Sequence, residues 1–339
     1  GFDGTNILDP DQAIMNDRAT SSDSGGKGIN APDIGLNMTF GSGDTNSYVN
    51  SYKAAVNLLT DPAQSRINIL SFPGIRSDEL ISHTVERVEE YGKALLVLDI
   101  PHINTDGDRM YDDTTGNVNV RKTIENFSDK NYDTSYAAAY FPDVVIEDSG
   151  KRRLVPATVA ALSAISHNDN TSFPWFAPAG FNRGSLNFVK SARARLNKAA
   201  RDVAYEGRVN PISTFPKSGY VISGQKTLQR ARTSLDRVNV RRMLLEVKRR
   251  VSDVAIGFVF EANTPEVRSA FQKRVSDSLA NIQENQGIDQ FKVVIDSTNN
   301  TQDDIDSNIL NGRIVLVPTR AIEFVAIDFV ISNSGIDFV

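Results

Sequence analysis

The sequence contains no cysteine, and this absence removes several kinds of chemistry. Without a thiol the chain forms no disulfide, has no thiolate nucleophile and offers no cysteine ligand to a zinc ion or a redox centre. It also lacks a strong excess of either charge, because 37 Lys and Arg residues face 42 Asp and Glu residues, a net charge of -5. This balance is not typical of proteins that bind nucleic acid or acidic membranes through bulk charge.

Long apolar runs are missing too. No stretch approaches the roughly 20 uninterrupted apolar residues with which a helix crosses a bilayer. With 339 residues, 40% hydrophobic and 23% charged, the chain is long enough for one large domain or two ordinary ones with a buried core. It begins at Gly1 in the middle of a polar pattern, so we expect it to be part of a longer protein.

Residue patterns typical of metal sites are weak. The three histidines show no metal-ligand spacing: His83, His102 and His167. Residues 104–113 alternate oxygen-bearing side chains as a calcium loop does, but Gly107 is not at the sixth position and Thr115 replaces the glutamate of the twelfth. We interpret this run as a solvated loop and expect no metal.

Motifs for catalysis or cofactor binding are absent as well. The turn that follows the apolar run at 67–74 has one glycine and no phosphate-binding pattern, and the chain has no GxSxG motif. We therefore expect no catalytic residue and no cofactor.

The first hundred residues predict a βαβ unit. Polar residues 1–50 read as loop, and helical spacing of apolar side chains then predicts helices at about 47–60 and 77–91, with Ser77 as the N-cap of the second. Apolar runs predict strands at 67–74 and 94–101. Because strands joined by a helix lie parallel, we expect an α/β fold with a mixed, partly parallel sheet flanked by helices.

A long polar insertion, residues 102–135, interrupts this pattern and is interpreted as a surface excursion. The segments after it are predicted from periodicity and from proline positions. They are a strand over 135–148 broken at Pro142, a helix over 156–166 that begins with Pro156, helices over 189–205 and 238–254, a strand over 255–263, a helix that Thr264 caps, and strands over 291–296 and 313–317.

The segment from Ala321 to Ile331 is apolar on both faces except at Glu323 and Asp328, and as one strand it would span about 36 Å. Such a strand left unpaired presents free N–H and C=O groups beside apolar side chains, which is a template for joining another chain. We expect a C-terminal β-strand arm that pairs with another subunit. Its predicted contact residues are Ile322, Phe324, Val325, Ile327, Phe329, Val330 and Ile331.

Basic residues are dense between Lys190 and Arg250. Nucleic-acid binding there would also need stacking aromatics or a recognised module, and this region has few aromatics and no recognised module. We interpret the basic side chains of the helix at 238–254 as its solvated face. Five of them are candidates for ionic contact with an acidic protein partner: Arg241, Arg242, Lys248, Arg249 and Arg250.

Seven segments follow one another in a definite order: SYAAAYFPDVVI (135–146), LVPATVAALSAISHND (154–169), FAPAG (176–180), VNPISTFPKSGYVISGQKTL (209–228), RVNVRRMLLEVKRRV (237–251), FVFEANTPEVR (258–268) and IVLVPTRAIEFVAIDFVI (314–331). In this order they resemble the contractile tail sheath family. Residues 67–74 and 94–101 are similar to earlier strands of that family, whereas 1–45 and 102–134 show little resemblance. Residues 221–226 depart from the Gly-X-Trp-Gly-X-Arg pattern usual there.

The resemblance implies that the chain is the carboxyl-terminal, protease-resistant-like fragment of a large phage sheath subunit. Such a subunit polymerises helically around the tail tube and contracts to drive the tube through the host envelope during genome delivery. The implied partners are other copies of the sheath protein, the tail tube protein, and baseplate and tail terminator proteins, with no direct nucleic-acid contact and no membrane insertion. The implied location is the virion tail, assembled in the host cytoplasm, and the isolated fragment is expected to be monomeric.

The expected domain organisation has three parts. Residues 1–65 form a polar loop-rich segment with the first helix, 66–318 the α/β core domain, and 319–339 the C-terminal arm. Two other functions stay open from the residues alone. One is a carboxylate-dependent α/β hydrolase with its site near Pro73 and Gly74 or Asp99. The other is a basic nucleic-acid-binding module centred on 232–250.

Overall fold

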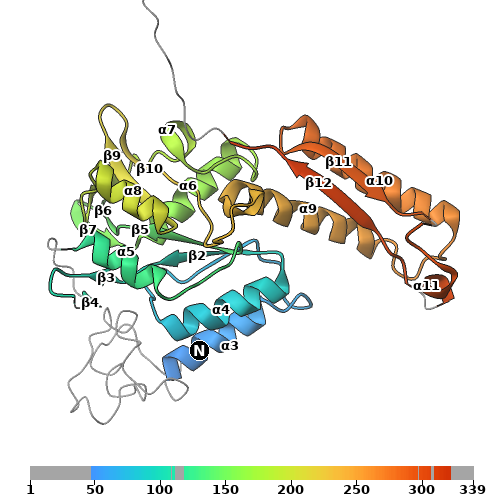
Figure 1. Cartoon of the computed structure of the whole chain (residues 1–339), viewed down its shortest axis with the longest axis horizontal. Helices are drawn as coiled ribbons and strands as arrows, with labels where there is room; N and C mark the ends of the chain where they lie inside the picture. The colour runs from blue at the N-terminus through green and yellow to red at the C-terminus, as the bar shows by residue number, and fades with distance from the viewer. Residues whose placement is uncertain (1–46, 108, 111–117, 297, 307–308, 322–339) are drawn as a thin grey trace, which may run out of the picture.

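The computed structural model describes residues 47–107, 109–110, 118–296, 298–306 and 309–321 (Figure 1). Its largest sheet has five strands in the order β1-β2-β5-β9-β10. Their bounds are Ile69–Ser71, Leu95–Asp99, Ala137–Phe141, Val209–Phe215 and Gly219–Ile222. Strands β1, β2, β5 and β9 run parallel, and β10 pairs antiparallel with β9. The predicted mixed, partly parallel sheet is confirmed.

Helices cover both faces of this sheet. Successive side chains of β2 point to opposite faces, and both sets are buried. Leu96 and Leu98 belong to one buried cluster, and Leu95 and Val97 belong to another. The first cluster contains buried side chains of α3 (Ser47–Leu59), α4 (Asp78–Tyr91), α5 (Val120–Ser128) and α8 (Lys198–Glu206). The second contains side chains of α6 (Ala157–Thr171) and α9 (Val238–Ile256). The parallel strands are therefore buried on both sides.

Helix α4 begins and ends where its sequence predicts. The Ser77 side chain accepts a hydrogen bond from the backbone N–H of Leu80 and so caps the first turn. Gly92 ends the helix with a φ of 67°, a left-handed conformation that glycine adopts without strain. Because α4 joins two parallel neighbours, β1 and β2, the predicted βαβ unit is confirmed.

Smaller sheets surround the main one. Pro142 separates β5 from β6 (Val144–Asp148), as the sequence predicts, and β6 lies between β7 (Lys151–Val155) and β8 (Val189–Ala192). Strands β3 (His102–Ile103) and β4 (Arg109–Met110) form a short antiparallel pair. The short helix α7 spans Gly180–Arg183.

An elongated extension consists of α9, α10 (Pro265–Glu284) and the antiparallel hairpin of β11 (Ile288–Val294) and β12 (Arg313–Pro318), with α11 (Gln302–Asp306) between the strands (Figure 1). It has its own apolar cluster, which includes Trp175. Thr264 caps α10 by accepting a hydrogen bond from the N–H of Val267, as predicted. None of the described helices combines the length and apolar character that crossing a bilayer requires.

The polar segment 102–135 is not loop alone, which corrects its interpretation as a surface excursion. Its second half forms α5, which Asn119 caps by accepting a hydrogen bond from the N–H of Lys122. Only a narrow stripe of this helix is buried, chiefly Ile124 and Phe127. Few apolar residues are needed to hold so short a helix against α8. The polar composition of the segment therefore does not predict the helix.

The helix predicted over 189–205 is wrong in its first half. Residues Val189–Ala192 form β8, and α8 starts only at Lys198, where Asn197 accepts a hydrogen bond from the N–H of Ala200. The apolar residues of this stretch fit helical spacing, but pairing with β6 satisfies the backbone of the first four.

The strand predicted over 255–263 is also wrong. Helix α9 continues to Ile256, and turns follow in which Phe260 has a φ of 71°. The apolar side chains of this segment do not alternate across a sheet. Phe258 instead packs edge-on against Phe271 of α10, with 5.1 Å between ring centroids.

Candidate functional site

Charged side chains are buried together at the carboxyl ends of the parallel strands, where α/β proteins commonly bind ligands. Arg76 follows the turn after β1, Asp99 ends β2, and Asp143 follows β5. The Nη2 atom of Arg76 lies 2.7 and 2.8 Å from the two carboxylate oxygens of Asp143. Arg193, just after β8, brings its Nη1 to 3.8 Å from the same carboxylate. We call these four residues, with His102, the buried ion cluster.

Both oxygens of the Asp99 carboxylate accept hydrogen bonds from donors within the chain. The carboxylate accepts hydrogen bonds from the backbone N–H and the hydroxyl of Thr158, at 2.9 and 2.7 Å, and from the N–H of Gly74 at 2.8 Å. Burial raises the pKa of Asp99, and the charge of Arg76 opposes that shift. Burial alone would lower the pKa of Arg76, but Asp143 and Asp99 outweigh it, so the pKa is raised.

His102 is 1% exposed and lies beside the same carboxylate, with 3.7 Å between its Nδ1 and Asp143 Oδ2. Burial lowers its pKa well below 6.5, and the charges of Arg76 and Arg193 lower it further. The ring is therefore neutral at neutral pH. The cluster balances two guanidinium groups against two carboxylates, and it joins β2 to α6 and the turn after β1 to the end of β5.

This geometry does not support the hydrolase placed near Pro73 and Gly74 or Asp99. The Gly74 N–H and both Asp99 oxygens already serve intrachain hydrogen bonds. The cavities described below are lined by other residues.

No group of three or more His, Asp or Glu side chains in the described residues is arranged to hold a metal ion. His83 on α4 lies 3.0 Å from the side-chain oxygen of Asn57, and His167 is exposed on α6. At the start of the 104–113 run, the Asn104 side chain accepts a hydrogen bond from the N–H of Gly107 at 2.8 Å. Residues 108 and 111–113 of that run lie outside the described residues.

Two of the five basic side chains of α9 are buried, so their interpretation as a solvated face is wrong. Arg241 and Arg242 are 4% and 5% exposed. The Arg241 guanidinium lies 4.0 Å from the ring centroid of Tyr136 and donates to the Ser135 hydroxyl. Arg242 donates to Asp169 of α6 at 2.5 Å. Helix α9 packs between the sheet and α10, so part of its polar side also meets protein.

The other three basic side chains of α9 are half exposed. The Lys248 ammonium donates to the Tyr136 hydroxyl at 3.0 Å, and Arg249 and Arg250 share the Glu246 carboxylate at 2.6 and 2.8 Å. Intrachain contacts thus account for all five, and their contact with a partner stays a prediction. An isolated basic face of the kind that binds nucleic acid is not formed by this helix.

The β11-β12 hairpin presents apolar side chains to solvent. Ile314 and Leu316 of β12 face the apolar cluster of the extension, whereas Val315 and Val317 alternate with them and are 48% and 45% exposed. Within the described chain this sheet has two strands, so each has one edge without a neighbour. The predicted intersubunit strand, Ile322, Phe324, Val325, Ile327, Phe329, Val330 and Ile331, lies outside the described residues.

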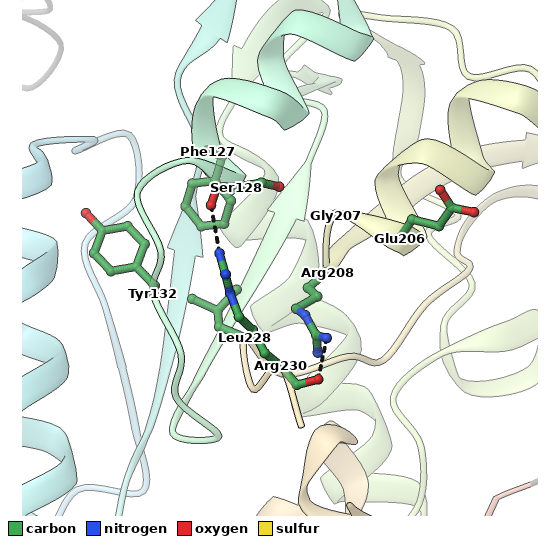
Figure 2. A pocket seen from close by; sticks show the side chains of 8 residues that line it. All are labelled: Phe127, Ser128, Tyr132, Glu206, Gly207, Arg208, Leu228 and Arg230. Atoms are coloured by element: carbon green, nitrogen blue, oxygen red, sulfur yellow. Dashed lines mark hydrogen bonds between the residues drawn. The ribbon is translucent and has the colours of Figure 1, made fainter. Parts of the chain in front are cut away.

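A basic cavity of about 280 Å³ lies between α5 and the end of α8 (Figure 2). Arg208 donates to the carbonyl of Arg230 at 2.6 Å, and Arg230 donates to the carbonyl of Ser128 at 3.1 Å. Burial lowers the pKa of Arg208, Asp133 and Asp236 oppose this, and Arg230 and Arg232 lower it further. Positive charge is therefore concentrated at this end of α8.

Two larger cavities adjoin it, of about 570 and 760 Å³. Both are lined by Tyr205 and Glu206 of α8 and by Ala321, the last described residue. We call the pair the α8 groove. One half is mostly apolar and the other is mostly basic.

The chain has curated relatives, although no family model matches it. It is 36% identical over 188 residues to the tail sheath protein of Vibrio phage KVP40, a match covering 56% of this chain and 28% of that protein. It is 32% identical over 226 residues to the tail sheath protein of Enterobacteria phage T4, covering 65% of this chain and 34% of that protein. It is therefore similar in sequence to phage tail sheath proteins. The match spans about a third of the length of these relatives.

Solved structures share the fold of this chain. The anti-feeding prophage baseplate structure contains a chain with a TM-score of 0.66 at 17% identity, with 86% of this chain and 75% of that chain covered. A sheath complex of an extracellular contractile injection system in its contracted state gives a TM-score of 0.64 at 19% identity, with 82% and 79% covered. The resemblance noted from the seven segments is confirmed.

The sequence predicts only some of the residues that the structure brings together. It singles out Asp99 but not Arg76, Asp143 or Arg193. A polar residue directly after each parallel strand is the signal that could have found Asp143, since these ends meet at one edge of the sheet. The groove residues Arg208 and Arg320 have no such signal, because about 110 residues of sequence separate them.

Proposed function

We propose that this chain is part of a subunit of a contractile phage tail sheath, a structural protein rather than an enzyme. The subunit polymerises helically around the tail tube and contracts to drive the tube through the host envelope during genome delivery. Sequence similarity to two phage tail sheath proteins carries the proposal. The shared fold with injection-system sheath chains, one in a contracted state, supports it. Nothing in the described residues favours the hydrolase or the nucleic-acid-binding module.

Strand exchange at the hairpin is the proposed link between subunits. Residues 321–331 are apolar on both faces, and the β11-β12 sheet has open edges beside exposed Val315 and Val317. A strand added to such an edge gains main-chain hydrogen bonds, and its alternating side chains fix the register. The donor is residues 319–339 of one subunit, and the acceptor is the hairpin of a neighbour.

The contact is heterologous, because the donated strand and the receiving hairpin are different surfaces. Contacts of this kind build a helical filament where the rotation between neighbours does not close a ring, as the proposed sheath requires. The subunits linked by exchanged strands stay connected when they move as rigid bodies from the extended to the contracted state. In this proposal residues 1–65 lead to the outer parts of the subunit and residues 66–318 form the core that moves.

The proposed partners follow from this role. They are other sheath subunits, the tail tube protein, and baseplate and tail terminator proteins. Chains similar in fold come from a baseplate and a sheath complex, which supports the first and third of these. The subunit is assembled in the host cytoplasm and resides in the virion tail, and the fragment of 339 residues alone is a monomer.

Sedimentation of the intact natural protein with and without residues 319–339 tests the proposal. We expect the unmodified protein to form long polymers and the shortened one to remain monomeric, with the same unfolding midpoint for the core. Polymers that persist without the arm would contradict strand exchange. A closed symmetric dimer held by residues 321–331 would contradict a filament.

A further inference from the structure

The apolar half of the α8 groove contains an exposed aromatic side chain. Phe181 of α7 is 59% exposed and stands edge-on to Phe215, with 5.3 Å between ring centroids. Pro211 and Val221 of the sheet line the same cavity, whose volume of about 570 Å³ is large enough for several side chains. This half is therefore suited to an apolar segment of polypeptide.

The other half of the groove carries an excess of positive charge. Five cationic side chains line it, and two carboxylates accompany them, which leaves an excess of three positive charges. The cations are Arg208, Lys226, Arg232, Arg237 and Arg320, and the acids are Glu206 and Asp236. A segment that fits both halves must be apolar and must also carry acids.

Residues 322–339 have this composition. Eight of the ten residues from 322 to 331 are apolar, and the other two are Glu323 and Asp328. Asp337 is a third acid, and the stretch contains no Lys or Arg. Residues 322–331 thus carry two negative charges, opposite in sign to the excess of the groove, and Asp337 adds a third.

The last described residue before this segment, Ala321, lies in the groove. Ala321 lines both halves, and β12 ends beside α7 in Figure 1. Five extended residues span about 17 Å, so residues 322–326 reach the apolar half without any rearrangement of the core. A tethered segment binds at the high effective concentration that a short tether provides, and this favours the chain's own segment over that of a second copy.

We propose that residues 322–331 of the chain occupy its own α8 groove in the unassembled subunit. Docking there withholds the strand that a neighbouring hairpin would receive. The consequence for assembly rests on the proposed function, whereas the docking itself does not. Growth of a filament would then require that an incoming hairpin displace the segment from the groove.

Disulfide trapping tests the docking directly, because the natural chain has no cysteine. The trapping variant is Phe181→Cys with Ala326→Cys in the full 339-residue chain. The control variant is Asp289→Cys with Ala326→Cys. Asp289 is exposed, lies outside the groove and follows Ile288, which pairs with Pro318 at the end of β12, so it is also near the start of the segment. Circular dichroism confirms that both variants fold.

Under mild oxidation we expect the Phe181→Cys variant to form an intrachain disulfide at least about tenfold faster than the control, since docking raises the local thiol concentration. Equal rates in the two variants would overturn the proposal. Disulfides that join two chains would overturn it as well, because the groove would then hold a second copy's segment.

Charge reversal tests the basic half. Adding Arg232→Glu and Arg320→Glu to the trapping variant replaces two positive charges of that half with two negative ones and should slow trapping several-fold. Lys292→Glu on the exposed side of β11 should not slow it. Unchanged trapping after reversal would overturn the charge match on which the proposal depends. Because trapping is measured on monomers, a failure here is distinct from a failure of the sheath to polymerise.

Discussion

Asp99 accepts hydrogen bonds from both the backbone N–H and the hydroxyl of Thr158, at 2.9 and 2.7 Å. The pair joins the end of β2 to the first turn of α6, so the sheet and its covering helix share one buried carboxylate. The same carboxylate accepts the Gly74 N–H from the turn after β1. Three elements that meet at one edge of the sheet are therefore held by a single side chain.

Replacing this carboxylate should destabilise the fold strongly. Asp99→Asn removes the charge that faces Arg76. The NH2 group of the new amide would also face N–H and hydroxyl donors of Gly74 and Thr158, with which it cannot form hydrogen bonds as an acceptor. We expect the free energy of unfolding to fall by about 3 kcal/mol, measured by urea denaturation. The matched control is Asp253→Asn, which breaks an exposed pair with Arg66 at 3.2 Å and should cost at most about 0.5 kcal/mol. Equal effects would show that the buried ion cluster does not stabilise the fold.

His102 should make stability depend on pH near neutrality. Its folded pKa lies well below 6.5, whereas in the unfolded chain it takes up a proton near 6.5. The unfolded state therefore binds more protons as the pH falls below that value. Stability is present above it and is lost by up to about 1.4 kcal/mol per pH unit below it.

The His102→Gln variant isolates this contribution from that of Asp99. Because the pKa of Asp99 is raised in the folded state, its own contribution to stability increases as the pH falls. Urea unfolding at about pH 7.5 and about pH 5.5 should give a smaller loss of stability for the variant than for the unchanged chain. The exposed His167→Gln serves as the control and should keep the original dependence. A His102→Gln chain with the unchanged slope would contradict the assignment.

The two kinds of arginine on α9 should respond differently to the same substitution. Arg242→Met leaves Asp169 without its buried partner and should cost about 2 kcal/mol of stability. Arg250→Met removes a half-exposed side chain whose acid, Glu246, keeps Arg249, so the loss should stay below about 0.5 kcal/mol. Chemical denaturation of both variants measures the difference, and similar losses would argue that burial of Arg242 contributes little.

Periodicity predicts elements whose partners are near in sequence, and it fails where the partner is distant. Ser77 and Thr264 are found as caps because their acceptor role is local. Residues Val189–Ala192 become a strand only because β6 is available to pair with them, which helical spacing of their side chains does not reveal. In the same way, the apolar run after α9 packs onto α10 rather than into a sheet.

Sequence reasoning fails in the candidate site for the same reason. The sequence predicts that Arg241 is a solvated cation, but the ring of Tyr136, which is 105 positions earlier in the chain, covers it. The α8 groove combines residues from α7, α8, the β9-β10 strands and the end of β12, so no single segment encodes it. The apolar residues 321–331, by contrast, indicate an association surface from composition alone.

Charge on the exposed face of β12 should block association without weakening the fold. Val315→Lys with Val317→Lys places two ammonium groups beside the edge to which a donated strand would add, against its apolar side chains. We expect the intact natural protein carrying both to remain monomeric in sedimentation, with stability within about 0.5 kcal/mol of the original. Ile256→Lys with Val259→Lys makes the same change at the exposed end of α9, 58% and 60% exposed, and should leave polymers intact. Polymers of the β12 variant would exclude this face from the contact.

Negative-stain electron microscopy of the intact natural protein, purified alone and within phage tails, tests the sheath assignment most directly. The account predicts hollow, striated cylinders that are longer and narrower before discharge and shorter and wider after it. It also predicts that these cylinders disappear when residues 319–339 are deleted. Tails that show the same cylinders without those residues, or a protein that never forms a cylinder, would contradict it.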